Sequence, residues 1–259
     1  MVGMEVFSPS QLLVGLNSNI QFNRFGNKIY FGNAQVKDSF QSTSPAKLCN
    51  EFAIKKMISD NPEVRKILAS HRIPARINMA ELQDLMENHC KDTQNISVEI
   101  YKNLPQALKQ QVNIADLKDG ALLHDFGKSL IPPEILNKNG ALTEDEHKIM
   151  DLHSELGYQL LKTTGLNDKV LNLVRFHHHN YETNDKAAKN FIPDINLQII
   201  NLADKYSALT EKRVYKEAFS PKKALTIIYS DVKDGKVHPF LFQALVKAVS
   251  EQNEIVKVS

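Results

Sequence analysis

The sequence predicts an all-α protein: a helical bundle over residues 76–259, preceded by a small N-terminal region, residues 1–75, of unknown role. Three observations lead to this prediction. The 259-residue chain is 42% apolar and 24% charged, which is the ordinary composition of a globular domain long enough to bury a core. Beyond about residue 45, apolar side chains recur at helical spacing. Residues that favour helix caps precede several of these segments, so helices are expected over most of the chain.

The N-terminal region contains a local β signal. Residues 20–22 and 28–31 are short apolar and aromatic runs on either side of a turn that contains Gly26. This pattern predicts a β-hairpin. Residues 33–44 are rich in serine, asparagine, glutamine and threonine, which predicts a linker.

The first helices are indicated by their caps. Ser44-Pro45 and Asn61-Pro62 each place a cap residue before a proline at the first helical position, where no intrahelical donor is lost. Two short helices are therefore expected at about residues 45–59 and 62–70.

The middle of the chain carries one long periodic stretch and one strong cap. Residues 79–104 fit a long helix broken near 92–95, which Pro105 ends or restarts. Thr143 with Glu146 three residues later forms a capping box, which opens a helix with a leucine-rich stripe. Further helices are expected at about residues 115–126, 167–178, 194–210, 221–231 and 238–250.

Composition excludes several classes of protein. Lysine and arginine (32) nearly balance aspartate and glutamate (30), so no long nucleic acid is expected as a partner. No apolar run approaches the ~18 residues needed to span a bilayer, and the start of the chain lacks a secretory signal, which predicts a cytoplasmic protein without a membrane partner. Cys49 and Cys90 are too few for a disulfide framework and are expected to be reduced.

The distribution of histidines suggests a metal site. The residues His124, Asp125, His153, His177, His178, His179 and Asp204 all fall near the ends or faces of predicted helices. Imidazole with carboxylate is the ligand set of a borderline transition metal, and the absence of a thiolate disfavours structural zinc. Taken singly, each histidine could instead be a hydrogen-bonded core residue, and the triple-histidine run could be a solvated helix end.

The segment His124-Asp125-Phe126-Gly127-Lys128 favours a metal centre over isolated core histidines. Adjacent helical residues project about 100° apart, so both ligands reach one metal only from the edge of the core. Gly127 then lets the chain turn and keeps Lys128 close by. An ammonium group beside a metal suits a phosphate ester.

This segment and those that follow it resemble the HD phosphohydrolase superfamily, specifically its HD-GYP branch of cyclic dinucleotide phosphodiesterases. The matching motifs are L-H-D-[IFV]-G-K at 123–128, I-P at 131–132, I-L-x-K-x-G-x-L-T-x-x-E at 135–146, H-x-x-x-G at 153–157, the paired histidines at 177–178, and A-D-x-[YF]-x-A-L-T-x-x-R-x-Y-[RK] at 203–216.

The resemblance implies the fold of an HD-domain helical bundle and a set of site residues. It assigns metal ligation to His124, Asp125, His153, His177, His178 and Asp204, with His89 as the best candidate for the upstream histidine of the family. Asp125 would bridge two divalent transition-metal ions, iron or manganese. Two ions are favoured over three because Leu85 stands where some relatives have an additional glutamate.

The resemblance also implies catalytic and substrate-binding roles. Asp125 and Lys128 would be catalytic. Asp125 would hold metals that activate a water for attack on phosphorus, and Lys128 would neutralise a phosphate oxygen. Lys128, Arg213 and Lys216 would bind the substrate. For Arg213 and Lys216, a solvated basic helix end is the alternative.

The sequence departs from the family pattern at two places. Residues 179–185 replace the usual glutamate and Asp-Gly-x-Gly-Tyr-Pro loop, and Ser207 replaces a common second aspartate. The leading hypothesis is a metal-dependent phosphodiesterase acting on a cyclic dinucleotide or related nucleotide phosphoester. The alternatives are an HD phosphohydrolase of another phosphoester and a catalytically weak signalling module, and a homodimer or a signalling-protein partner also stays open.

Overall fold

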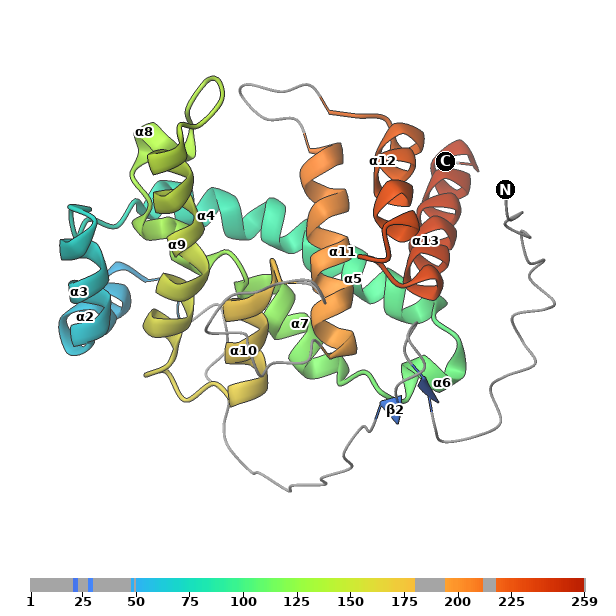
Figure 1. Cartoon of the computed structure of the whole chain (residues 1–259), viewed down its shortest axis with the longest axis horizontal. Helices are drawn as coiled ribbons and strands as arrows, with labels where there is room; N and C mark the ends of the chain where they lie inside the picture. The colour runs from blue at the N-terminus through green and yellow to red at the C-terminus, as the bar shows by residue number, and fades with distance from the viewer. Residues whose placement is uncertain are drawn as a thin grey trace. The chain divides into compact units, whose positions relative to one another are not determined.

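The computed structural model describes residues 21–22, 28–29, 48, 50–179, 194–211 and 218–258 of the chain, shown in Figure 1. The chain divides into two compact units, Met1–Gln41 and Ser42–Ser259. In the first unit, β1 (Gln21–Phe22) pairs antiparallel with β2 (Lys28–Ile29), with Gln21 opposite Ile29. The two runs predicted to form a hairpin therefore pair over two residues each. The predicted linker, residues 33–44, lies outside the described residues.

The described part of the second unit is helical, which confirms the predicted all-α fold class. Its elements in chain order are α2 (Glu51–Asp60), α3 (Pro62–Ser70), α4 (Met79–Glu87), α5 (His89–Asn103), α6 (Gln106–Lys109), α7 (Ile114–Leu123), the 3₁₀ helix η2 (Phe126–Leu130), α8 (Pro133–Leu136), α9 (Glu144–Leu161), α10 (Asp168–Phe176), α11 (Ile195–Thr210), α12 (Pro221–Lys233) and α13 (Pro239–Val258). Among the described residues, no helix has the length and apolar character needed to cross a bilayer.

Helices α2 and α3 belong to the same compact unit as the rest of the bundle, because both pack against α9. The structural division between the units lies after Gln41. The functional boundary that the sequence places after residue 75 stays a prediction.

Two predicted helix caps are present in the structure. The side chain of Asn61 accepts hydrogen bonds from the backbone N–H groups of Glu63 and Val64, and Pro62 takes the first helical position of α3. The Thr143 side chain accepts from the Glu146 backbone N–H, while the Glu146 carboxylate accepts from the Thr143 N–H at 2.7 Å. The Ser44-Pro45 cap lies outside the described residues.

The break in the long helix was predicted at the wrong residue. The helix is interrupted at Asn88, not near residues 92–95, so α4 ends at Glu87 and α5 begins at His89. Asn88 has a non-helical ψ of −90°, and both its side-chain amide and its backbone N–H bond back to Asp84. These bonds tie Asn88 to the last turn of α4, and its ψ then turns the chain out of the helix. As a result, His89 becomes the first residue of a new helix.

The helix predicted over residues 115–126 also ends earlier than expected, at Leu123. His124 and Asp125 leave α7, and the chain tightens into η2. The histidine and aspartate are therefore presented by a helix end, which frees both side chains from the constraint of a continuing helix.

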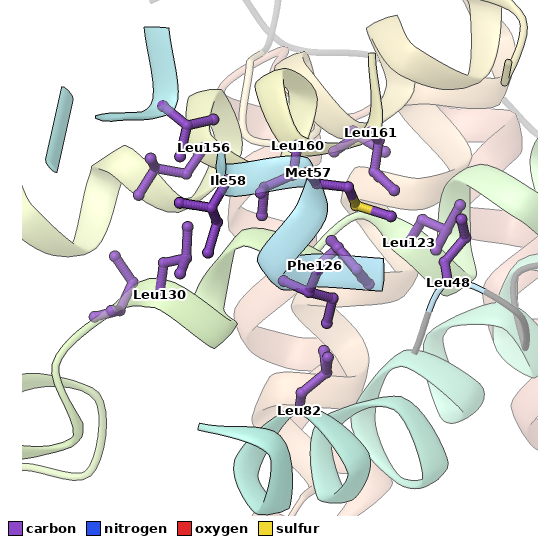
Figure 2. Packing of buried hydrophobic residues seen from close by; sticks show 14 of the residues in the cluster. Leu48, Met57, Ile58, Leu82, Leu123, Phe126, Leu130, Leu156, Leu160 and Leu161 are labelled. Atoms are coloured by element: carbon purple, nitrogen blue, oxygen red, sulfur yellow. The ribbon is translucent and has the colours of Figure 1, made fainter. Parts of the chain in front are cut away.

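Two apolar clusters hold the unit together. One gathers buried side chains from α2, α3, α4, η2, α9 and α10, and Figure 2 shows Phe126 among the leucines of its neighbours. The other gathers residues of α5, α7, α10, α11, α12 and α13. Phe126 is fully buried, and truncating such a ring to alanine typically costs about 3–5 kcal/mol. It directly follows Asp125, so the first cluster anchors the chain beside the polar site.

Candidate metal centre

Five elements of the fold bring their polar residues to one point. His89 begins α5, His124 and Asp125 follow α7, His153 lies in α9, His177 and His178 follow α10, and Asp204 lies in α11. All except His178 and Asp204 are buried almost completely, and the Asp204 side chain is 15% exposed. The structure thus brings together every residue that the sequence named as a metal ligand.

Asp125 lies at the centre, and its two carboxylate oxygens face different histidines. Its Oδ2 lies 3.3 Å from the Nε2 atoms of both His89 and His124. Its Oδ1 lies 3.4 Å from the Nε2 of His153 and 3.7 Å from that of His177. One carboxylate is therefore shared between two sets of imidazoles.

The ligand atoms form two groups that meet at Asp125. The first, here called the His89 group, consists of His89, His124 and Asp125. Asp204 borders it, with Oδ1 at 3.0 Å from the Nε2 of His89.

The second group, here called the His153 group, consists of Asp125, His153, His177 and His178. Its imidazole nitrogens are close together: the Nε2 of His153 lies 3.2 Å from that of His177 and 3.0 Å from that of His178. Facing lone pairs repel one another, so this arrangement favours a cation or a proton between the rings.

Three of the histidines are oriented by the backbone of their own segment. The Nδ1 atoms of His124, His153 and His177 lie 2.8, 2.6 and 2.7 Å from the carbonyl oxygens three residues earlier in the chain. Each ring therefore has its Nδ1 directed to the backbone and its Nε2 toward the centre. Such outer hydrogen bonds fix the tautomer and the orientation of metal-binding histidines.

Gly127 allows η2 to approach α9 closely enough to complete the centre. A Cβ at this position would lie 2.0 Å from the carbonyl oxygen of His153 and 2.5 Å from the backbone nitrogen of Gly157. No side chain fits in that space. The glycine thus lets Asp125, two residues earlier, reach the histidine of α9.

The carboxylates of the centre are held ionised. Burial alone would raise the pKa of Asp125, but the charges of Lys128 and His124 hold it well below its usual value. Burial likewise opposes ionisation of Asp204, and the neighbouring imidazoles of His124 and His89 hold its pKa well below the usual value.

The histidines are shifted in opposite directions in the metal-free protein. Burial would lower the pKa of His124, but the charge of Asp125 raises it to about 10. Burial lowers the pKa of His153 to about 3 and that of His177 well below its usual value. The His153 group therefore presents neutral imidazoles near pH 7, the protonation state that a metal requires.

The chemistry of these residues fits metal binding. Among the described residues, the Nε2 of His124 and the Oδ1 of Asp125 are buried and have no hydrogen-bond partner. A buried unpaired polar atom costs about 1–3 kcal/mol, a cost that coordination would remove. Nitrogen and carboxylate donors together suit iron, manganese or zinc.

Lys128 lies at the edge of the centre, with its Nζ 2.6 Å from the Oδ2 of Asp125. Its ammonium group therefore adjoins the carboxylate shared by the two groups. The other predicted substrate-binding residues, Arg213 and Lys216, lie outside the described residues. Residues 180–185, which belong to the segment that differs from the family pattern, also lie outside the described residues.

Sequence reasoning assigned no site contact to Ser207 of α11 or to Glu211, the residue directly after that helix. The Nδ1 of His89 lies 3.3 Å from the Oγ of Ser207 and 3.6 Å from the Oε2 of Glu211. Part of the signal was available, because Ser207 follows Asp204 at the three-residue spacing of one helix face. The contact with His89 could not be predicted, because His89 lies on another helix.

A pocket of about 400 Å³ adjoins the His153 group at His178. It lies between α9 and α10 and is lined by Asp151, Ser154, Glu155, Arg175, Phe176, His178 and His179. An ion pair between Arg175 and Glu155, with 2.7 Å from Nε to Oε2, spans the two helices at this pocket. The pocket gives space beside His178 for a group larger than a phosphate.

Comparison with characterised proteins gives several partial matches. The cyclic di-GMP phosphodiesterase response regulator RpfG of Xanthomonas campestris pv. campestris is 34% identical over 154 residues, which are 57% of this chain and 39% of that protein. A 3′3′-cGAMP-specific phosphodiesterase 1 of Vibrio cholerae is 28% identical over 49% of this chain and 30% of its own length. This chain thus spans less than half the length of these relatives.

A solved structure shares the fold. The protein Bd1817 of Bdellovibrio bacteriovorus, described as a HDG"Y"P protein, aligns with a TM-score of 0.51 and 15% identity over 79% of this chain and 67% of that chain. The family model described as HD domain matches residues 62–239, more than half of this chain. The chain therefore belongs to the HD domain family and is of the HD-GYP-like type that its motifs predicted.

Proposed function

We propose that this protein is a metal-dependent phosphodiesterase that hydrolyses a cyclic dinucleotide or a related nucleotide phosphoester. The observation that carries the proposal is the central position of Asp125, with one carboxylate oxygen facing each group of histidines. A carboxylate shared in this way suits a bridge between two cations.

The ligand assignment follows from the two groups. His89, His124 and Asp204, with the Oδ2 of Asp125, would hold one cation. His153, His177 and His178, with the Oδ1 of Asp125, would hold the other. When bound, two divalent ions of iron or manganese supply an acidified water as the nucleophile and positive charge for the transition state of phosphoryl transfer.

The other roles belong to cationic side chains. Lys128 would bind a non-bridging phosphate oxygen, because its ammonium group lies beside Asp125 at the rim of the centre. Arg213 and Lys216 would hold a second phosphate or the sugar-phosphate backbone. Together these groups would orient the phosphorus for in-line attack.

The substrate class is supported by the relatives and by the pocket. Relatives matched by this chain are named as phosphodiesterases of cyclic di-GMP and of 3′3′-cGAMP. The pocket beside His178 offers about 400 Å³ next to the centre, enough for part of a nucleotide.

A second candidate is the hydrolysis of a different phosphoester by the same centre. It is favoured by the departure at residues 179–185, where the usual glutamate and glycine-rich loop of the family is replaced by a polar sequence. The candidate metal ligands all lie outside residues 180–185, so a change of loop would alter substrate alignment more than metal binding.

A panel of substrates tests the proposal. The full chain, loaded with manganese or with iron, is assayed on cyclic di-GMP, 3′3′-cGAMP and bis(p-nitrophenyl) phosphate. We expect metal-dependent cleavage of a phosphodiester that Asp125→Asn abolishes and that a matched change on α7, Asp119→Asn, leaves unchanged. If a preparation with two bound metals cleaves none of these diesters, the phosphodiesterase proposal is wrong and a binding module is the better description.

A further inference from the structure

His89 is oriented differently from the three histidines that bond to their own backbone. It is the first residue of α5, and the preceding residue, Asn88, interrupts the helix. The Nδ1 of His89 instead faces α11, with the Oγ of Ser207 at 3.3 Å and the Oε2 of Glu211 at 3.6 Å. Its orientation therefore depends on side chains of a distant segment.

We propose that Ser207 and Glu211 are positioning residues that hold His89 as a metal ligand and set the affinity of the His89 group for its cation. This inference rests on the two-metal centre proposed above. Because the Nε2 of His89 faces Asp125 and Asp204, a metal held there would take the lone pair of that nitrogen. The proton of the neutral ring would then lie on Nδ1, which would donate to the oxygens of Ser207 and Glu211.

The two residues contribute different interactions. Ser207 is only 2% exposed and supplies a short, neutral acceptor in a fixed place. Glu211, whose side chain is 26% exposed, supplies a negative charge at the outer edge of the ring. A carboxylate or hydroxyl at this position increases the electron density on the ligating nitrogen, and loss of such a partner typically costs 10–100-fold in metal affinity.

Helix α11 and the residue that follows it, Glu211, consequently contact both edges of one imidazole. Asp204 lies at the Nε2 edge, whereas Ser207 and Glu211 lie at the Nδ1 edge. In the His153 group, the Nδ1 atoms of His153 and His177 lie against backbone carbonyls, and neither Ser207 nor Glu211 orients these rings. Changes at residues 207 and 211 should therefore weaken one cation and spare the other.

A cobalt titration of the metal-free full chain tests this inference. Co²⁺ binding is followed by its visible absorption and by metal content per chain. We expect two bound ions in the wild type. In Ser207→Ala and in Glu211→Gln, we expect one ion to bind about 10–100-fold more weakly while the affinity of the other is unchanged.

Two controls separate positioning from a general effect on folding. Thr210→Val removes another hydroxyl of α11, one that bonds to the Tyr206 carbonyl and does not contact His89, and should leave both affinities unchanged. Ser207→Thr retains the hydroxyl and should restore tight binding of the second ion. The melting temperature of each metal-free variant is measured in parallel.

Each result bears on the inference. Unchanged affinities in both test variants would overturn it, and so would equal weakening of both ions with a lower melting temperature, which indicates a role in the fold. Weaker binding in only one of the two variants would overturn the joint assignment, because only that residue would then position His89. A wild-type protein that binds no second ion would refute the two-metal centre itself, and the inference with it.

Discussion

The backbone of Gly127 lies so close to His153 that a Cβ on the glycine would come within 2.0 Å of the histidine carbonyl oxygen. This contact joins η2 to α9 at the residues that flank the metal ligands. The glycine that follows the His-Asp pair is therefore a packing requirement of the centre. Its role in the turn, which the sequence suggested, is secondary.

Substitution of Gly127 should destabilise the protein and open the centre. Gly127→Ala forces η2 away from α9, and overpacking of this severity costs about 3 kcal/mol or more in the free energy of unfolding. Gly157→Ala should cost less, because its Cβ would meet only the Gly127 nitrogen at 3.1 Å and a methyl of Val174 at 3.2 Å. Urea unfolding and metal content of both variants check this order. Equal stability of Gly127→Ala and the wild type would show that the approach is not needed.

Removal of the Lys128 ammonium should separate metal binding from turnover. Lys128 contacts Asp125 but is not a ligand, and loss of its positive charge does not weaken cation binding. We expect Lys128→Met to keep its metal content while kcat falls on the order of 10²-fold, the usual scale for one electrostatic stabiliser. Metal analysis with steady-state kinetics on one preparation checks this. Joint loss of metal and activity would assign the lysine a structural role.

The stability of the metal-free protein should depend on pH on both sides of about 6.5. His153 has its pKa lowered by burial from 6.5 to about 3, so the unfolded chain binds an extra proton between these values, and stability falls as pH falls. His124 has its pKa raised to about 10 against the opposing effect of burial, mainly by the charge of Asp125. It therefore stabilises the fold fully below 6.5, and this contribution is lost as pH rises toward 10.

Urea unfolding between pH 5 and 9 in the presence of a chelator measures this profile. His153→Gln should flatten the acidic side, and His124→Gln should flatten the alkaline side. A wild-type profile that rises steadily across this range would contradict the opposite shifts of the two histidines.

Cyclic di-GMP should be a poor substrate for this protein, even if a generic phosphodiester is cleaved. Residue 179 is histidine where the HD-GYP pattern has a glutamate after the paired histidines, and residues 180–185 contain none of the glycines of that pattern. We expect metal-dependent cleavage of bis(p-nitrophenyl) phosphate with weak or absent cleavage of cyclic di-GMP. A kcat/KM for cyclic di-GMP of ~10⁴ M⁻¹s⁻¹ or more would show that the loop is not required.

Local signals in the sequence predicted much of the fold. The Thr143–Glu146 capping box and the Asn61-Pro62 cap depend on neighbouring residues alone, and both occur in the structure. The break in the long helix was placed near residues 92–95 because apolar periodicity does not record the single non-helical ψ of Asn88. The end of α7 was placed at residue 126 because the same periodicity does not distinguish α7 from the 3₁₀ helix η2 that follows it.

The sequence named the residues that lie together at the candidate centre, but not the side chains that contact them from behind. Motif resemblance indicated His124, Asp125 and Asp204, and a loose spacing indicated His89. Ser207 was noted only as a departure from the family, although it lies against the ring of His89. Which side chains stand behind a ligand depends on how two helices pack, and a single sequence does not specify that.

The metal content of the wild type and of Asp125→Ala tests the central claim most directly. Both proteins are purified under the same conditions, loaded with manganese or iron, and analysed for metal per chain. The shared carboxylate predicts close to two ions per chain in the wild type. In Asp125→Ala, no tightly bound metal should remain. A wild type that holds no metal, or an Asp125→Ala variant that keeps two ions, would contradict it.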